Sequence, residues 1–220
     1  MVLEISSSAP WRKAMTNLAH KRMSAAEYLA LERASETKHQ FFDGEVFAMS
    51  GGSYVHNLIS RNVLTRLTIR LAGKPCEPLG SDQRVTTPRG LYTYPDVTVH
   101  CGPPEFVDEK SDTLTNPRLL VEVLSPSTER YDRGKKFEQY REVRTLTDYL
   151  IVSQDRASVD HFFRREADGP WLLMGYSGLE TQVAIDNFGI VLPLSEIYAG
   201  VDFSAAEPDP LPPLRPGATF

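Results

Sequence analysis

The 220-residue sequence contains little cysteine and no long apolar run. Its two cysteines, Cys76 and Cys101, are too few for a disulfide scaffold or a cysteine-ligated zinc site, so we expect a reducing, cytoplasmic setting. No segment approaches the ~20 apolar residues that cross a bilayer. The opening MVLEISSSAPWRK lacks the apolar segment of a signal peptide. These absences predict a protein without a membrane anchor.

An excess of positive charge and several catalytic signatures are also missing. The formal net charge of −5 gives no global basic field, which argues against non-specific coating of nucleic acid but allows a local basic groove beside an acidic site. There is no G-x-S-x-G elbow, Walker loop or G-x-G-x-x-G fingerprint. A zinc hydrolase would require His56, His100 and Cys101 to converge, and their spacing matches no familiar ligand pattern.

Composition separates one folded domain from two irregular ends. Residues 1–22 are aperiodic and predict a loosely ordered extension, whereas the proline-rich residues 204–220 predict a disordered tail. The intervening residues 23–203 suit a single domain with a substantial core.

Local signals predict the first elements of this domain. Ser24 begins a capping box, which starts a short helix. Asp43-Gly44 between apolar residues predicts a hairpin. Apolar residues recur at helical spacing over residues 55–71, and Gly73 ends that helix.

Strands dominate the rest of the domain. We predict them over residues 82–87, 95–101, 118–124, 148–153, 158–165, 171–176, 181–186 and 190–194. A helix over about residues 129–144 separates the third of these strands from the fourth. This order predicts an α/β fold of mixed α+β type, with a mixed central sheet flanked by helices and a C-terminal β-meander.

The strand RLLVEVL, residues 118–124, carries an acid among apolar residues. Both faces are otherwise apolar, which predicts a central strand covered on both sides. A buried lone carboxylate costs several kcal/mol unless it is paired, hydrogen-bonded or bound to a metal. Glu122 therefore needs a partner. An arginine, the exposed edge of the sheet and a metal ion are the alternatives.

A second acid, Asp96, opens the strand at 95–101 directly after Pro95. Aspartate is common beside proline at strand entrances, so Asp96 by itself could be a turn residue. Two acids at corresponding depths of adjacent strands can instead share Mg²⁺, which favours one or two carboxylates with water and substrate phosphate.

Two adjacent lysines follow on the predicted helix. At ~100° per residue, Lys136 falls on the flank of the core side and Lys135 falls nearly opposite, in water. Lys136 could lie near the metal site, or it could form an ordinary i,i+4 ion pair with Asp132.

These motifs together resemble a known family. The chain combines PD at 95–96 with VEVLSPST at 121–128, DRGKKFEQY at 132–140 and DGEVFAMSGGSYVHN at 43–57. This pattern resembles the Uma-type putative restriction endonuclease family, a branch of the PD-(D/E)XK nuclease superfamily, over residues 23–203. The resemblance implies a restriction endonuclease-like core, cleavage of DNA phosphodiester bonds with Mg²⁺ or Mn²⁺, and a homodimer.

The resemblance also implies roles for individual residues. Asp96 takes the place of the PD acid and Glu122 that of the (D/E) acid, and the main-chain carbonyl of Val123 joins them as a metal ligand. The motif lysine would fall at Leu124. The lysine of this family is displaced onto the next helix, where Lys136 matches it and would position the attacking water or stabilise developing charge.

Four further residues match the family pattern. Glu45 matches an additional acid that could hold a second cation or orient the first through water. His56, Asp82 and Tyr140 match recurrent pocket residues, although His56 could equally be a packed core histidine. Two other interpretations stay open: a nuclease fold that binds DNA or protein without turnover, and an acid cluster that is purely structural in an oligomer.

Overall fold

A computed structural model of the protein describes residues 22–126 and 128–204. The two irregular ends predicted for residues 1–22 and 204–220 therefore lie outside the described residues, apart from residues 22 and 204 themselves.

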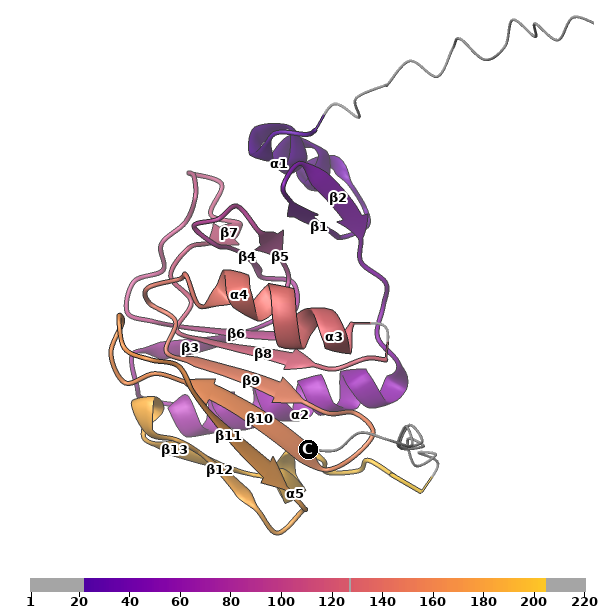
Figure 1. The fold of residues 1–220 in the computed structure, drawn as a ribbon, viewed down its shortest axis with the longest axis vertical. Helices are drawn as coiled ribbons and strands as arrows, with labels where there is room; N and C mark the ends of the chain where they lie inside the picture. The colour runs from indigo at the N-terminus through magenta and orange to yellow at the C-terminus, as the bar shows by residue number, and fades with distance from the viewer. Residues whose placement is uncertain (1–21, 127, 205–220) are drawn as a thin grey trace, which may run out of the picture.

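A six-stranded mixed sheet forms the centre of the molecule (Figure 1). Its strand order is β11-β10-β9-β8-β6-β3. The strands are β3 (Cys76–Gly80), β6 (Val97–Cys101), β8 (Leu119–Val123), β9 (Asp148–Val152), β10 (Ser158–Phe163) and β11 (Leu172–Ser177). Only β8 and β9 run parallel, and the other neighbouring pairs are antiparallel. The predicted mixed sheet is therefore confirmed.

The central strand β8 is covered on both faces, as its sequence predicts. Leu119, Val121 and Val123 belong to the core that packs against helix α2 (Tyr54–Leu71). Leu120 and Leu124 belong to a second core on the opposite face. The 3₁₀ turn η3 (Asp186–Phe188), the hairpin of β12 (Gln182–Ile185) and β13 (Ile190–Pro193), and helix α5 (Leu194–Ile197) complete the core on the α2 side.

A smaller five-stranded sheet, ordered β2-β1-β5-β4-β7, lies with helix α1 (Ala25–Ala34) at the top of Figure 1. Its strands are β1 (His39–Phe42), β2 (Glu45–Ala48), β4 (Arg84–Thr86), β5 (Tyr92–Thr93) and β7 (Thr113–Leu114). The predicted capping box is present at Ser24. Asp43 (φ 49°) and Gly44 (φ 82°) form the predicted hairpin turn, because both adopt the left-handed conformation that such turns require.

The helix predicted over residues 129–144 is shorter and less regular. It consists of α3 (Glu129–Tyr131), a π-helical turn η2 (Asp132–Lys136) and α4 (Phe137–Tyr140). Periodicity at 3.6 residues per turn does not reveal a π turn, which is rare and often found at functional sites. The wider turn holds Asp132 and Lys136 in buried positions.

Sequence patterns missed the edge strand β3. Its CEPLG sequence contains proline, which sheets accept at their edges. The register places Cys76 opposite Cys101, and their sulfurs form a disulfide of 2.02 Å. Such bonds are uncommon in reducing compartments, so the cytoplasmic location stays a prediction. In the described part of the chain, no helix is both long and apolar enough to cross a membrane.

Candidate active site

The strand register brings Asp96 and Glu122 to one cavity. Val97 on β6 pairs with Val121 on β8, so Asp96 and Glu122 are the next residues along the two antiparallel strands. The main-chain N–H of Val123 donates to Asp96 Oδ2 at 2.7 Å, which ties the start of β6 to the end of β8. Both acids line a cavity of about 560 Å³. Their side chains are 14% and 7% exposed.

Glu122 is held from the helical side of the sheet. Lys136 Nζ lies 2.7 Å from its Oε1, and the Tyr140 hydroxyl donates to the same oxygen at 2.7 Å. Burial raises the pKa of Glu122 to about 8; Lys136 opposes this shift, whereas Asp132 and Asp96 add to it. The carboxylate is therefore fixed in place but costly to ionise without further positive charge.

Lys136 forms both of the contacts considered from the sequence. Its ammonium contacts Glu122 and also lies 3.2 Å from Asp132 Oδ1. Burial disfavours the charged ammonium, but Glu122 and Asp132 more than offset this, so the pKa of Lys136 is raised. Lys135 is exposed. One buried lysine thus faces three carboxylates, those of Glu122, Asp132 and Asp96.

His56 lines the same cavity from the first turn of α2. Its Nε2 lies 3.3 Å from Asp96 Oδ2. This contact raises the pKa of His56, although burial acts in the opposite direction. A Cβ at Gly52 would lie only 2.5 Å from His56 Nδ1, so the glycine allows the loop to approach the ring. His56 is therefore a cavity residue in contact with Asp96 rather than a core histidine.

Glu45 and Asp82 are not among the residues that line the cavity. Glu45 is exposed at the turn end of the β1–β2 hairpin, where it pairs with Phe42. The open end of that hairpin, at Lys38 and Met49, lines the cavity instead, four residues or roughly 13 Å away at ~3.3 Å per residue. Asp82 is fully exposed and contacts Lys38 Nζ at 2.5 Å. Their placement follows from how the hairpin and the turn between β3 and β4 pack, which the family pattern does not encode.

Sequence reasoning missed several residues at the cavity. Lys38 lines it from the small sheet, and Gln154 lines it beyond β9. Ser53 caps α2 and donates to Gln154 at 3.1 Å. The SGGS segment stands out in the sequence only as part of the family pattern, and no local pattern links Lys38 to Asp96 or Glu122, more than fifty positions away.

The donor atoms suit a hard divalent cation with few protein ligands. Within residues 22–126 and 128–204, no group of three or more His, Cys, Asp or Glu side chains converges to hold a metal. The cavity instead offers the carboxylates of Asp96 and Glu122, with the Val123 main chain beside them. Mg²⁺ is typically held by one or two carboxylates, with water completing its shell. A cation there would also offset the cost of ionising Glu122.

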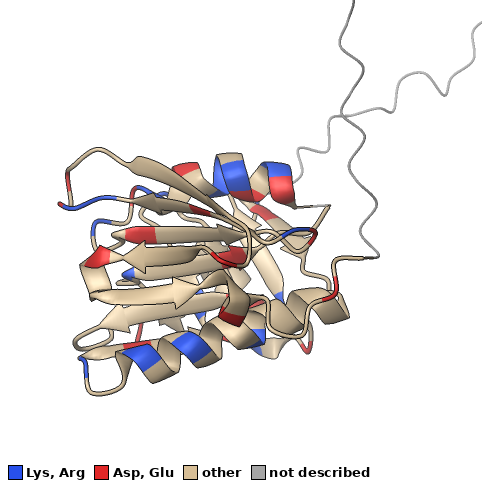
Figure 2. Cartoon of the chain, turned by 90° about the horizontal axis from the view of Figure 1, so that it is seen from below, with Lys and Arg blue, Asp and Glu red and all other residues tan. Residues whose placement is uncertain are grey.

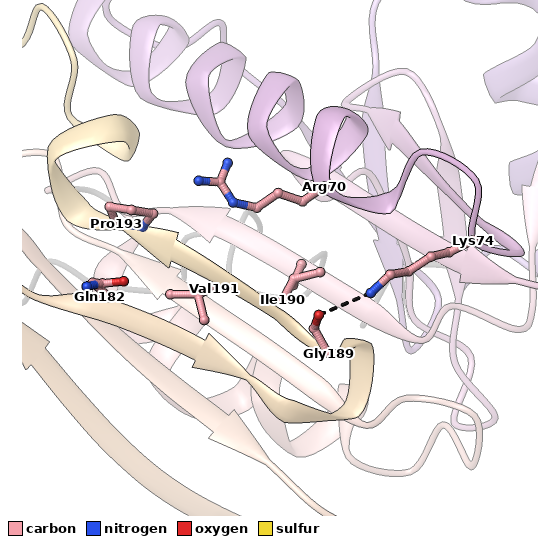
Figure 3. Close-up of a pocket in the computed structure, with 7 residues that line it drawn as sticks. All are labelled: Arg70, Lys74, Gln182, Gly189, Ile190, Val191 and Pro193. Carbon is pink, nitrogen blue, oxygen red and sulfur yellow. Dashed lines mark hydrogen bonds between the residues drawn. The ribbon is translucent and has the colours of Figure 1, made fainter.

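A second cavity, of about 430 Å³, differs in chemistry (Figure 3). It lies between β13 and the end of α2, a helix that carries several arginines (blue in Figure 2). No acid lines it, and its cations are engaged: Arg70 contacts Glu196 at 2.6 Å, and Lys74 donates to the carbonyls of Phe188 and Gly189. The acidic cavity is therefore the candidate active site.

Comparisons with known proteins show the family to which the chain belongs. The family model described as "Uma2: Putative restriction endonuclease" matches residues 25–195. Two relatives come from Synechocystis sp. "Uncharacterized protein slr1290" is 40% identical over 200 residues, which cover 90% of this chain and 98% of the relative. "Uncharacterized protein sll1609" is 34% identical over 164 residues, which cover 74% of this chain and 92% of the relative.

A solved structure shares the fold. It is the crystal structure of a putative nuclease belonging to DUF820 from Anabaena variabilis, with a TM-score of 0.65 over 80% of this chain and 97% of that chain. At 16% sequence identity, this similarity supports the fold alone. The match of the family model over most of the chain shows more: the chain belongs to the Uma2 family of putative restriction endonucleases.

Proposed function

We propose that this chain is a metal-dependent endonuclease that hydrolyses DNA phosphodiester bonds in the acidic cavity. The observation that carries the proposal is the placement of Asp96 and Glu122, one residue beyond a β6–β8 pair, with buried Lys136 on Glu122. Family membership supports a nuclease, with DNA as the substrate. The cofactor would be Mg²⁺ or Mn²⁺.

Asp96, Glu122 and the main-chain carbonyl of Val123 would hold the cation. When bound, it would polarise the scissile phosphate and lower the pKa of a water molecule. The chain itself fixes the ligands. Tyr140 and Lys136 hold one oxygen of Glu122, which leaves its second oxygen outside both contacts.

Lys136 would stabilise negative charge that develops on the phosphate. Its ammonium is already ordered by Glu122 and Asp132, so it needs no reorganisation when charge develops. His56 acts on Asp96 as a positioning residue, because its Nε2 faces Asp96 Oδ2 at 3.3 Å. Asp82 would act only indirectly, through the ion pair that holds Lys38 at the cavity rim.

The test is cleavage of supercoiled and linear DNA with Mg²⁺ or Mn²⁺. Wild type should cleave, and Glu122→Gln should lose on the order of 100-fold or more of the rate, as when one preorganised charge-stabilising group is removed. Lys136→Ala should lose a similar factor. Lys135→Ala, which removes the same charge from an exposed neighbouring position, should cleave nearly as fast as wild type.

Two results with DNA would contradict the proposal, and one with metal alone would contradict its cation site. One is DNA binding without any metal-dependent cleavage by the wild type, which would favour a binding module of the same fold. The other is equal loss of DNA affinity in both lysine variants with unchanged turnover, which would leave Lys136 as part of a basic surface only. A Mn²⁺ titration that Asp96→Asn or Glu122→Gln leaves unchanged would indicate a structural acid cluster.

A further inference from the structure

The strand β11 is the outer edge of the main sheet (Figure 1). Its six residues pair with β10 from Ser158↔Ser177 to Phe163↔Leu172, so its other side has no strand partner within the described residues. Leu172, Leu173 and Met174 are 46%, 59% and 48% exposed, although alternate residues of a strand point to opposite faces. Both faces of β11 therefore present apolar side chains to solvent.

This edge lacks the features that normally prevent strand pairing. Native edges are protected by proline, charged side chains, bulges or a covering element. The opposite edge, β3, contains Pro78 and Glu77 and is cross-linked to β6 through Cys76. In contrast, residues 169–179 carry no charge, and β11 contains no proline. Among the described residues, one edge of the sheet is protected and the other is not.

We propose that β11 pairs with β11 of a second copy of this chain, antiparallel, about a two-fold axis at Met174. The two six-stranded sheets would then form one continuous sheet. In this register Leu172 lies opposite Tyr176 of the partner subunit, and Leu173 lies opposite Gly175 of the partner subunit. An uncharged strand can pair with itself in this way without placing like charges opposite one another.

The size of the contact sets its strength. A six-residue edge buries less than the ~800 Å² per partner of a standard interface, so β11 alone predicts a weak dimer that forms with rising concentration. This inference does not depend on the proposed nuclease activity, and inactive variants should dimerise equally well.

Cysteine cross-linking tests the register. Two copies of position 174 would face each other at a Cα distance of ~4.5–5.5 Å, within the ~4.4–6.8 Å range of disulfides. Copies of position 172 would lie four residues apart along the strands, ~13 Å. Met174→Cys should therefore give a disulfide-linked dimer at least ~10 times faster than Leu172→Cys, whose exposure is similar. The native cysteines do not compete, since they are bonded to each other.

Sedimentation of the full chain tests the dimer itself. Wild type and Ile69→Asp, which changes an exposed residue on α2, should dimerise alike as concentration rises. Met174→Asp should weaken the dimer ~10-fold or more, because it places two carboxylates opposite each other. A wild type that stays monomeric at every concentration would overturn the proposal, as would an unchanged Met174→Asp dimer or equal cross-linking at positions 172 and 174. If the true partner of β11 is a strand of a different protein, the wild type will stay monomeric at every concentration.

Discussion

Replacing Lys136 by methionine should destabilise the protein in a pH-dependent way. Methionine keeps most of the apolar stem but removes the ammonium that contacts Glu122 and Asp132. Lys135→Met is the matched control, because it makes the same substitution at the adjacent, exposed position.

The magnitude follows from burial. The Lys136 side chain is 6% exposed, and removing one partner of a buried ion pair costs about 3–5 kcal/mol. For a domain of this size, 1 kcal/mol shifts the melting temperature by about 2–4 °C, so we expect a drop of about 6–20 °C at alkaline pH. Lys135→Met should stay within about 0.5 kcal/mol of wild type.

The cost should shrink at low pH because Glu122 can take up a proton. Burial already raises the pKa of Glu122 from 4.5 to about 8, and removing Lys136 removes the main influence that lowers it. An acid with a raised pKa in the folded state stabilises folding fully below its unfolded pKa, near 4.5, and loses that contribution as pH rises through its folded value. Lys136→Met should therefore be much less destabilising at pH 5 than at pH 9.

Urea unfolding followed by circular dichroism, between pH 5 and pH 9 with a chelator present, measures this directly. In the Glu122→Gln background the same lysine substitution should cost less at pH 9, because one of the two carboxylates is already neutral. The reasoning would be refuted if both lysine substitutions had equal effects, or if the cost of Lys136→Met were independent of pH.

The remaining predictions concern the acids and the loop before α2. Without metal, wild type should lose stability between pH 5 and pH 9 in unfolding experiments, whereas Glu122→Gln should lose less, because the raised pKa of His56 still acts in this direction but that of Glu122 no longer does; a wild type that gains stability over this range would contradict the raised pKa of Glu122. Asp96→Asn should abolish cleavage with little change in melting temperature, and a collapse of the fold would show that its hydrogen bond to the β8 backbone is chiefly structural. Gly52→Ala should displace His56 and reduce cleavage at least ~10-fold, by disturbing the geometry at Asp96, whereas Gly51→Ala, where a Cβ meets open space, should cleave normally; equal activities would remove His56 from the positioning role.

Several elements of the fold can be predicted from short stretches of the sequence. The capping box at Ser24 and the Asp43-Gly44 turn are short-range signals, and both features are present. The apolar alternation of residues 118–124 predicted a strand covered on both faces, because side-chain direction in a strand has a period of two. Local periodicity failed at Asp132–Lys136, since a π turn depends on the surroundings that hold it.

The site shows the same division between local and tertiary information. The sequence by itself determined that Glu122 needs a partner, because an acid in a doubly covered strand cannot stay alone. Only the tertiary structure decided which partners it has: Lys136 and Tyr140 reach it from the helical segment, whereas the β6–β8 register places the like-charged Asp96 in the same cavity.

The positions of Glu45 and the two cysteines were likewise decided only by the fold. The fold left Glu45 outside the residues that line the cavity and placed Cys76 opposite Cys101, 25 residues along the chain. The Asp43-Gly44 turn fixes the register inside the β1–β2 hairpin, but the place of that hairpin against the cavity and the pairing of β3 with β6 depend on long-range packing. The sequence therefore determined which residue types must find partners, and the tertiary structure decided which atoms meet.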